Sequence, residues 1–113
     1  MIYLAAPYND KNKIIIQERI DKIYIVIAEF IKMGYHVITP LLMHEVVTRH
    51  NIDGSFSYWE DYCFNLLSRC DKMYVLCIDD WDNRPGVQKE IEYCREHGIP
   101  IQYISNDFFE HIK

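Results

Sequence analysis

Gly86 and Glu90, four residues apart, are the pair of residues in this sequence that most suggests chemistry. Gly86 and Glu90 lie in a segment with helical periodicity that follows an apolar run. Residues four apart share a helix face, and helical side chains lean toward the N-terminus, so we expect Glu90 to project over Gly86. The glycine would leave room for a ligand beside a carboxylate that could act as a nucleophile. Alternatively, Glu90 only complements the helix dipole, as many acids in a first turn do.

Polar residues that follow the other apolar runs could join this carboxylate. Tyr8 follows the apolar opening of the chain, and its phenol could orient a carboxylate or stack on a base. Asp80 and Asp82 follow the same apolar run as Glu90, and either could protonate a leaving group, although solvated loop acids are commoner. His44 lies after the second apolar run and could contact a ligand, although a surface histidine is the commoner case.

The elements that must position these residues follow from the alternation of apolar runs and helical patterns. We predict strands at residues 2–6, 35–39, 73–78 and 99–104, and helices at 13–33, after Ser55, from Pro85 to Gly98, and at 107–112. Asn12 and Gly34 are of the residue types that begin and end the first helix. Residues 41–54 are predicted to be a loop or irregular segment.

Nearly all-apolar strands separated by helices indicate a parallel sheet that is covered on both faces. Right-handed crossovers then give a single-domain, doubly wound, flavodoxin-like α/β fold over residues 1–113, with strand order 2-1-3-4. Ligands of such sheets bind at the carboxyl edge, between strands one and three. We therefore expect further ligand-binding residues in the two loops at that edge, namely Ala6, Pro7, Asn9, Trp81, Asn83 and Arg84.

Composition and charge exclude several classes of function. The 113 residues carry a net charge of −5 and no cluster of lysine and arginine, which argues against binding to polymeric nucleic acid. No apolar run reaches membrane-spanning length, so no membrane association is expected. The nine tyrosines exceed what a small core can hold, and we expect some of them at a pocket or at a subunit interface.

The cysteines and histidines lack the spacing of a metal site or of a disulfide framework. The four cysteines form no C-x-x-C pair, which is typical of buried thiols in a cytoplasmic protein. The five histidines show no ligand spacing, so no metal is expected. Neither G-x-G-x-x-G nor a P-loop sequence is present, and no cofactor is predicted.

An ordered set of short motifs resembles the nucleoside 2-deoxyribosyltransferase-like superfamily through nearly the whole chain. The motifs are Ile2-Tyr3-Leu4-Ala5-Ala6-Pro7-Tyr8, Gly34-Tyr35-His36-Val37-Ile38-Thr39-Pro40, Arg69-Cys70-Asp71, the run from Trp81 to Glu90, and Ile99-Pro100-Ile101. Each motif alone is weak. Their order is fairly specific for the superfamily and leaves the base, the sugar and the acceptor open.

The resemblance implies a flavodoxin-like fold and cleavage or transfer of the N-glycosidic bond of a nucleoside or nucleoside 5′-monophosphate. It implies that Glu90 attacks the anomeric carbon to form a covalent glycosyl-enzyme, that Tyr8 positions Glu90, and that Gly86 lies beside the substrate. It also implies a homodimer or a higher homo-oligomer. A non-catalytic binder of nucleotides or related metabolites on the same fold is the alternative hypothesis.

The sequence departs from the superfamily pattern at two positions. Cys63 stands where the superfamily usually has an aspartate that binds the sugar or assists leaving, and Asp61 is two residues away. Two residues turn a helical side chain by ~200°, so Asp61 does not replace that aspartate freely. Arg84 stands where a serine is usual, and its guanidinium could either bind a 5′-phosphate or fill the pocket.

Overall fold

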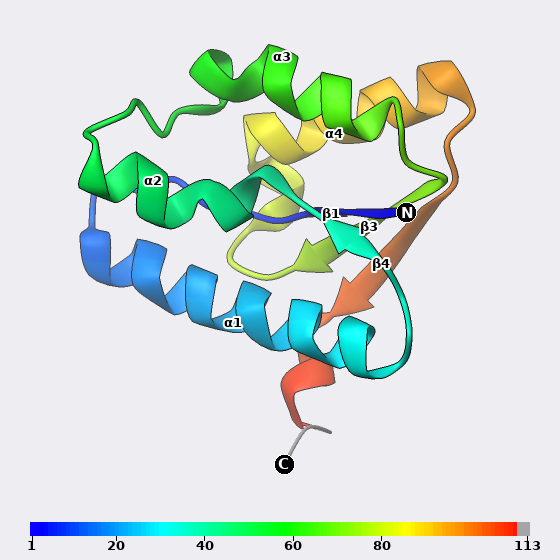
Figure 1. Ribbon diagram of the computed structural model, residues 1–113, viewed down its shortest axis with the longest axis horizontal. Coiled ribbons are helices and arrows are strands. Elements are labelled where there is room, and N and C mark those ends of the chain that lie inside the picture. The colour runs from blue at the N-terminus through cyan, green and yellow to red at the C-terminus, as the bar shows by residue number, and fades with distance from the viewer. Residues whose placement is uncertain (111–113) are drawn as a thin grey trace.

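The computed structural model describes residues 1–110 as a four-stranded parallel sheet between layers of helices (Figure 1). The strand order is β2-β1-β3-β4, which confirms the predicted flavodoxin-like topology. The strands are β1 (Ile2–Ala5), β2 (Val37–Ile38), β3 (Lys72–Cys77) and β4 (Ile101–Ser105). Across the sheet, Tyr3 of β1 is paired with Met73 of β3 and with Ile38 of β2.

Helices cover both faces of this sheet. The long helix α1 (Lys13–Lys32) covers one face, while α3 (Phe56–Leu67) and α4 (Pro85–His97) cover the other (Figure 1). Successive strand residues point to opposite faces. Tyr3 and Ala5 of β1 therefore pack in the core under α3 and α4, while Leu4 packs against α1. No helix within residues 1–110 is long and apolar enough to cross a membrane.

The predicted helix ends are largely confirmed. The side chain of Asn12 accepts a hydrogen bond from the backbone N–H of Ile14 at 2.9 Å and so caps α1. Gly34 follows α1 with φ +88°, and Gly98 follows α4 with φ +68°, a left-handed conformation that glycine adopts without steric cost. Ser55 precedes α3 in extended conformation, as predicted, but its side chain makes no capping hydrogen bond.

The segment between β2 and α3 differs from the prediction. Residues 41–54 were expected to be irregular, but a 3-10 helix (Pro40–Met43) leads into a short helix, α2 (His44–Arg49). A helix of six residues is too short to give a periodic apolar pattern, so the sequence carried no clear signal for it. At the other end, the described part of the predicted helix 107–112 is a 3-10 helix (Asn106–Glu110), and the remainder lies outside the described residues.

Candidate functional site

A cavity of about 360 Å³ opens beside β1, at the carboxyl edge of the sheet. Its walls come from β1 and the loop that follows it, from the 3-10 helix and α2, and from the N-terminal turns of α3 and α4. The topological switch point of a doubly wound sheet is where ligands of such folds bind. The cavity therefore occupies the place that the predicted topology assigns to a ligand.

Glu90 forms part of the cavity wall and is itself only 5% exposed. It lies on the face of α4 that packs against the sheet, and its Oε2 accepts a hydrogen bond from the hydroxyl of Tyr3. Burial raises the pKa of the Glu90 carboxyl to about 8, and the hydrogen bond from Tyr3 opposes that rise. At pH 7 the neutral carboxylic acid is therefore the predominant form of the free protein.

Tyr3 is a site residue that the sequence reasoning missed. Its side chain is fully buried, and burial beside the Glu90 carboxyl raises the pKa of the phenol well above its ordinary value. A usable signal was present, because a buried tyrosine in an apolar strand needs a partner for its hydroxyl. Strand alternation also puts Tyr3 on the same face as Ala5, under the helix that carries Glu90.

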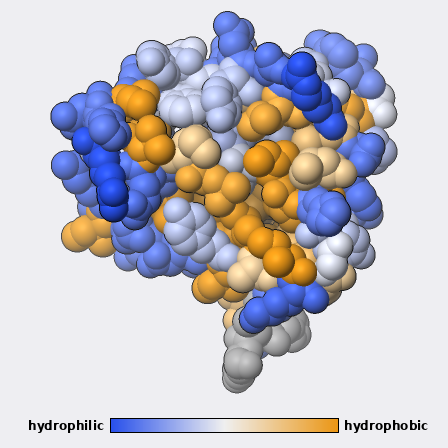
Figure 2. Space-filling view, in the orientation of Figure 1, coloured by the Kyte–Doolittle hydropathy of each residue, from blue (hydrophilic) through white to orange (hydrophobic). Residues whose placement is uncertain are grey.

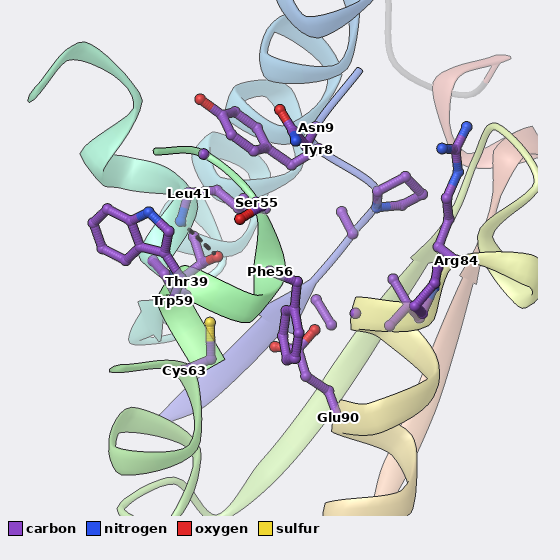
Figure 3. Close-up of a pocket in the computed structure, with 18 of the residues that line it drawn as sticks. Tyr8, Asn9, Thr39, Leu41, Ser55, Phe56, Trp59, Cys63, Arg84 and Glu90 are labelled. Atoms are coloured by element: carbon purple, nitrogen blue, oxygen red, sulfur yellow. Dashed lines mark hydrogen bonds between the residues drawn. The ribbon is translucent and has the colours of Figure 1, made fainter. Parts of the chain in front are cut away.

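Cys63 of α3 also lines the cavity and lies near Tyr3 and Glu90 (Figure 3). Burial and the negative charge that Glu90 can carry raise the pKa of the Cys63 thiol to about 12. A thiol with that pKa is a poor proton donor at neutral pH. Asp61, the nearest acid in the sequence, is exposed and does not line this cavity, so it does not take the place of the missing aspartate.

The space over Gly86 is occupied by an aromatic ring of the same protein. A Cβ atom added at Gly86 would lie 2.8 Å from Cδ1 of Phe56. Phe56 is the first residue of α3, and it lines the same cavity as Glu90 (Figure 3). Gly86 was expected to leave room for a ligand, but in this structure it leaves room for Phe56, which becomes a wall of the cavity.

Tyr8 lies at the end of the cavity away from Glu90 and has a different partner (Figure 3). Its hydroxyl is 2.8 Å from Nδ1 of His44, and the two rings meet edge to face. Partial burial raises the pKa of the Tyr8 phenol. The residue that contacts the Glu90 carboxyl is thus Tyr3, and Tyr8 forms a pair with His44.

Arg19 of α1 holds together the two loops that flank the switch point. The residue is 2% exposed, and its Nε donates to Oδ2 of Asp79 at 2.9 Å. Its Nη1 donates to the backbone carbonyls of Tyr8 at 3.2 Å and of Asn9 at 3.0 Å. Asp79 and Asp80 both have left-handed backbone, with φ +44° and +59°, a strained conformation for residues other than glycine. Sequence reasoning did not single out this buried arginine.

The structure brings most of the predicted site residues to the cavity and leaves four outside it. The predicted residues that line the cavity are Ala6, Pro7, Tyr8, Asn9, His44, Arg84, Gly86 and Glu90. The four that do not line it are Asp80, Trp81, Asp82 and Asn83.

These four residues lie in the loop between β3 and α4. Oδ1 of Asp80 accepts from the side-chain amide of Asn83 at 2.8 Å. Trp81 packs on Tyr103 of β4, with ring centroids 5.4 Å apart. The backbone carbonyl of Asp82 accepts a hydrogen bond from the side chain of Gln88. These contacts stabilise the loop rather than the cavity. Within residues 1–110, no group of histidine, cysteine and acidic side chains has the arrangement of a metal site.

Comparison with known proteins places the chain in a family but gives no activity. A search of curated proteins finds no match. Residues 1–106 match the family described as a domain of unknown function, DUF1937. Because this match spans nearly the whole chain, the protein belongs to the DUF1937 family.

Proposed function

We propose that this protein cleaves or transfers the N-glycosidic bond of a nucleoside or nucleoside 5′-monophosphate through a covalent glycosyl intermediate on Glu90. The observation that carries the proposal is a buried carboxyl at the wall of a ligand-sized cavity, with a tyrosine hydroxyl bound to one of its oxygens. A carboxyl whose pKa is raised strongly in a cleft is a common mark of a catalytic group. The sequence resemblance supports the same role for Glu90.

The chemistry requires Glu90 to ionise as the substrate reacts. Positive charge develops at the anomeric carbon as the bond to the base weakens, and a neighbouring carboxylate stabilises that charge in a dry site. The other Glu90 oxygen keeps its hydrogen bond from Tyr3, which favours the ionised form. Attack on the anomeric carbon then gives the glycosyl-enzyme, and water or a second base releases the sugar.

The first test is turnover of a panel of nucleosides and 5′-monophosphates, measured as free base released. We expect Glu90→Gln to abolish release, because the amide is a far weaker nucleophile than a carboxylate. Glu92→Gln is the matched control, since Glu92 is exposed on the same helix. Mass spectrometry of the wild-type protein, quenched in acid during turnover, should find one glycosyl group on the peptide that contains Glu90. Full turnover by Glu90→Gln would refute the proposal.

A second candidate function is reversible binding of a nucleotide or related metabolite without chemistry. Cys63 favours it, because the thiol stands where an acidic partner was expected and its pKa of about 12 makes it a poor proton donor. Calorimetry separates the two functions. Binding that is equally tight in wild type and Glu90→Gln, with no base released by either, would establish the binder.

The free thiols support a reducing compartment for either function. All four cysteines are unpaired with one another in the structure, and three of them are buried. We therefore retain the cytoplasm as the proposed location.

A further inference from the structure

One pair of side chains in the cavity is not used by the attack on the sugar. His44 is the first residue of α2, and its Nδ1 is 2.8 Å from the Tyr8 hydroxyl. Both side chains line the cavity. A hydrogen bond at one ring nitrogen of a histidine fixes the ring and leaves the other nitrogen for a ligand. Nε2 has no hydrogen-bond partner among residues 1–110, so it is the nitrogen that a bound molecule would contact.

The proposed reaction needs a proton donor for the leaving base, and the other groups near the cavity are poor ones. The Cys63 thiol has a pKa of about 12, and the Tyr3 hydroxyl already donates to Glu90. An arginine guanidinium does not give up a proton in proteins, which excludes Arg84 as the acid. The loop acids between β3 and α4 lie outside the cavity lining. Histidine is the residue type that exchanges protons near neutral pH.

We propose that His44 is the general acid that protonates the leaving base, and that Tyr8 is its positioning residue. This inference rests on the proposed function. Tyr8, the hydrogen-bond partner of His44, lies at the opposite end of the cavity from Glu90 (Figure 3). A nucleoside whose sugar contacts Glu90 therefore extends its base toward this pair. The proton goes to a ring nitrogen of the base on the side away from the sugar.

The proton and the electron pairs balance over the two half-reactions. Glu90 first loses its proton to solvent, and one oxygen of the resulting carboxylate then bonds to the anomeric carbon while the carbon–nitrogen bond breaks and that electron pair passes into the base. The base takes the proton from Nε2 of the His44 imidazolium and leaves neutral, while Nδ1–H donates to the Tyr8 oxygen. In the second half, Nε2 takes a proton from water, the water oxygen bonds to the anomeric carbon, and Glu90 departs as a carboxylate.

The test uses leaving groups that differ in their need for a proton. The pair is a purine nucleoside that the wild-type protein turns over and its N7-methyl derivative, whose cationic base departs as a neutral molecule without protonation. The variants are His44→Gln and Tyr8→Phe. His50→Gln is the control, because His50 is exposed just after α2 and does not line the cavity. Non-enzymatic base loss is subtracted in each case.

We expect His44→Gln to lower kcat/KM by about 10²–10⁴-fold on the unmethylated nucleoside and by less than about threefold on the N7-methyl one. Tyr8→Phe should show the same selectivity with a smaller loss, and His50→Gln should match wild type on both. Thermal unfolding of His44→Gln close to that of His50→Gln confirms that the variant is folded.

The failure of this inference can be told apart from the failure of the proposed function. Equal losses by His44→Gln on both substrates, or no loss on either, overturn the acid role while Glu90→Gln remains inactive. Turnover by Glu90→Gln, or no turnover of any substrate by wild type, overturns the proposed function and this inference with it.

Discussion

Glu90 is the residue on which the proposed function depends, and the burial of its carboxyl has a measurable cost in stability. The pKa of this carboxyl is about 8 in the folded protein, whereas its ordinary value is 4.5. Between these values the unfolded chain releases a proton that the folded protein retains. Tyr3 reduces the cost without removing it, since its hydrogen bond lowers the pKa against the larger effect of burial. Glu90 is thus a neutral acid in the free protein, whereas the proposed reaction uses its ionised form as the nucleophile.

The raised pKa of Glu90 predicts how stability changes with pH. Because the folded pKa is raised, the contribution of Glu90 to stability is greatest below pH 4.5, declines as pH rises, and levels off above pH 8. The full decline is on the order of 5 kcal/mol. The glutamine in Glu90→Gln cannot ionise. The free energy of unfolding of this variant, relative to that of wild type, should therefore increase by several kcal/mol from pH 5 to pH 8. Urea unfolding across that range measures it, since the remaining groups cancel in the difference. Glu92→Gln should follow wild type, and parallel curves for wild type and Glu90→Gln would contradict the raised pKa.

Arg84 gives a prediction about the substrate. It lines the cavity. Of its three guanidinium nitrogens, only Nε has a hydrogen-bond partner among the described residues, the backbone carbonyl of Asp79 at 3.4 Å. The remaining guanidinium nitrogens can bind a phosphate through charge-assisted hydrogen bonds. We expect Arg84→Ala to raise KM for a 5′-monophosphate by about 10–100-fold and to leave KM for the matching nucleoside unchanged. Arg84→Lys should recover part of the loss. An equal rise in KM for both substrates would show that Arg84 shapes the cavity and does not bind a phosphate.

At the scale of elements, the cavity wall depends on close packing between the first turns of α3 and α4. Phe56 is the first residue of α3, and Gly86 is the second residue of α4. The ring of Phe56 fills the space that a Cβ atom on residue 86 would take. The glycine therefore serves helix packing, and the ring sets the shape of the cavity beside Glu90. Lys89, on the next turn of α4, places its Nζ 5.9 Å from the centroid of the same ring.

The contact predicts a double-mutant cycle. Gly86→Ala should destabilise the protein by about 1–3 kcal/mol, because the new methyl group would lie 2.8–2.9 Å from two atoms of the Phe56 ring. In a Phe56→Ala background the same substitution should cost nothing or stabilise, since alanine favours helix over glycine by about 1 kcal/mol. Chemical denaturation of the four proteins measures the coupling. If Gly86→Ala lowered the free energy of unfolding by the same amount in both backgrounds, the Phe56 ring would not be the cause of the destabilisation.

At the scale of the whole molecule, the aromatic residues divide between the cavity and the surface. Tyr3 and Tyr8 line the cavity, as expected of some of the nine tyrosines. Others are exposed, among them Tyr58 and Tyr62 of α3, at 62% and 45%. In the view of Figure 2, hydrophobic residues gather across the middle of the face, and hydrophilic residues lie around them. Exposed aromatic side chains are enriched at protein interfaces.

These exposed side chains support the expected homo-oligomer. Light scattering coupled to gel filtration should give a mass at least twice the 13.6 kDa of the chain. Replacing Tyr58 and Tyr62 together by serine should shift the mass toward 13.6 kDa if α3 lies in the interface. Tyr103, 49% exposed on β4, provides the control position. A mass of 13.6 kDa for the wild-type protein at tens of micromolar would contradict the oligomer.

The sequence predicted what depends on local pattern and missed what depends on distant contacts. The long helices α1 and α4, the strand order and the edge that holds the cavity followed from periodicity and handedness. The six-residue helix α2 had no periodic signal. The contacts of Tyr3 with Glu90 and of Phe56 with Gly86 were missed because they join distant segments, and no single segment carries information about its partner. Glu90 was identified, together with Gly86 and Cys63 near it, but Tyr3 and Phe56 were not.

The Arg19 clamp has a consequence for how quickly a ligand can be exchanged. The buried guanidinium of Arg19 donates hydrogen bonds both to the loop after β1 and to Asp79, which follows β3. These two segments are therefore fixed to each other. The remaining side of the cavity, from α2 to the start of α3, contacts them mainly through side chains, such as the ring of Phe56 on α4 and the hydroxyl of Tyr8 on His44. We therefore expect association and release rates of a ligand to respond to substitutions on the α2–α3 side more than to substitutions in the two segments that Arg19 joins.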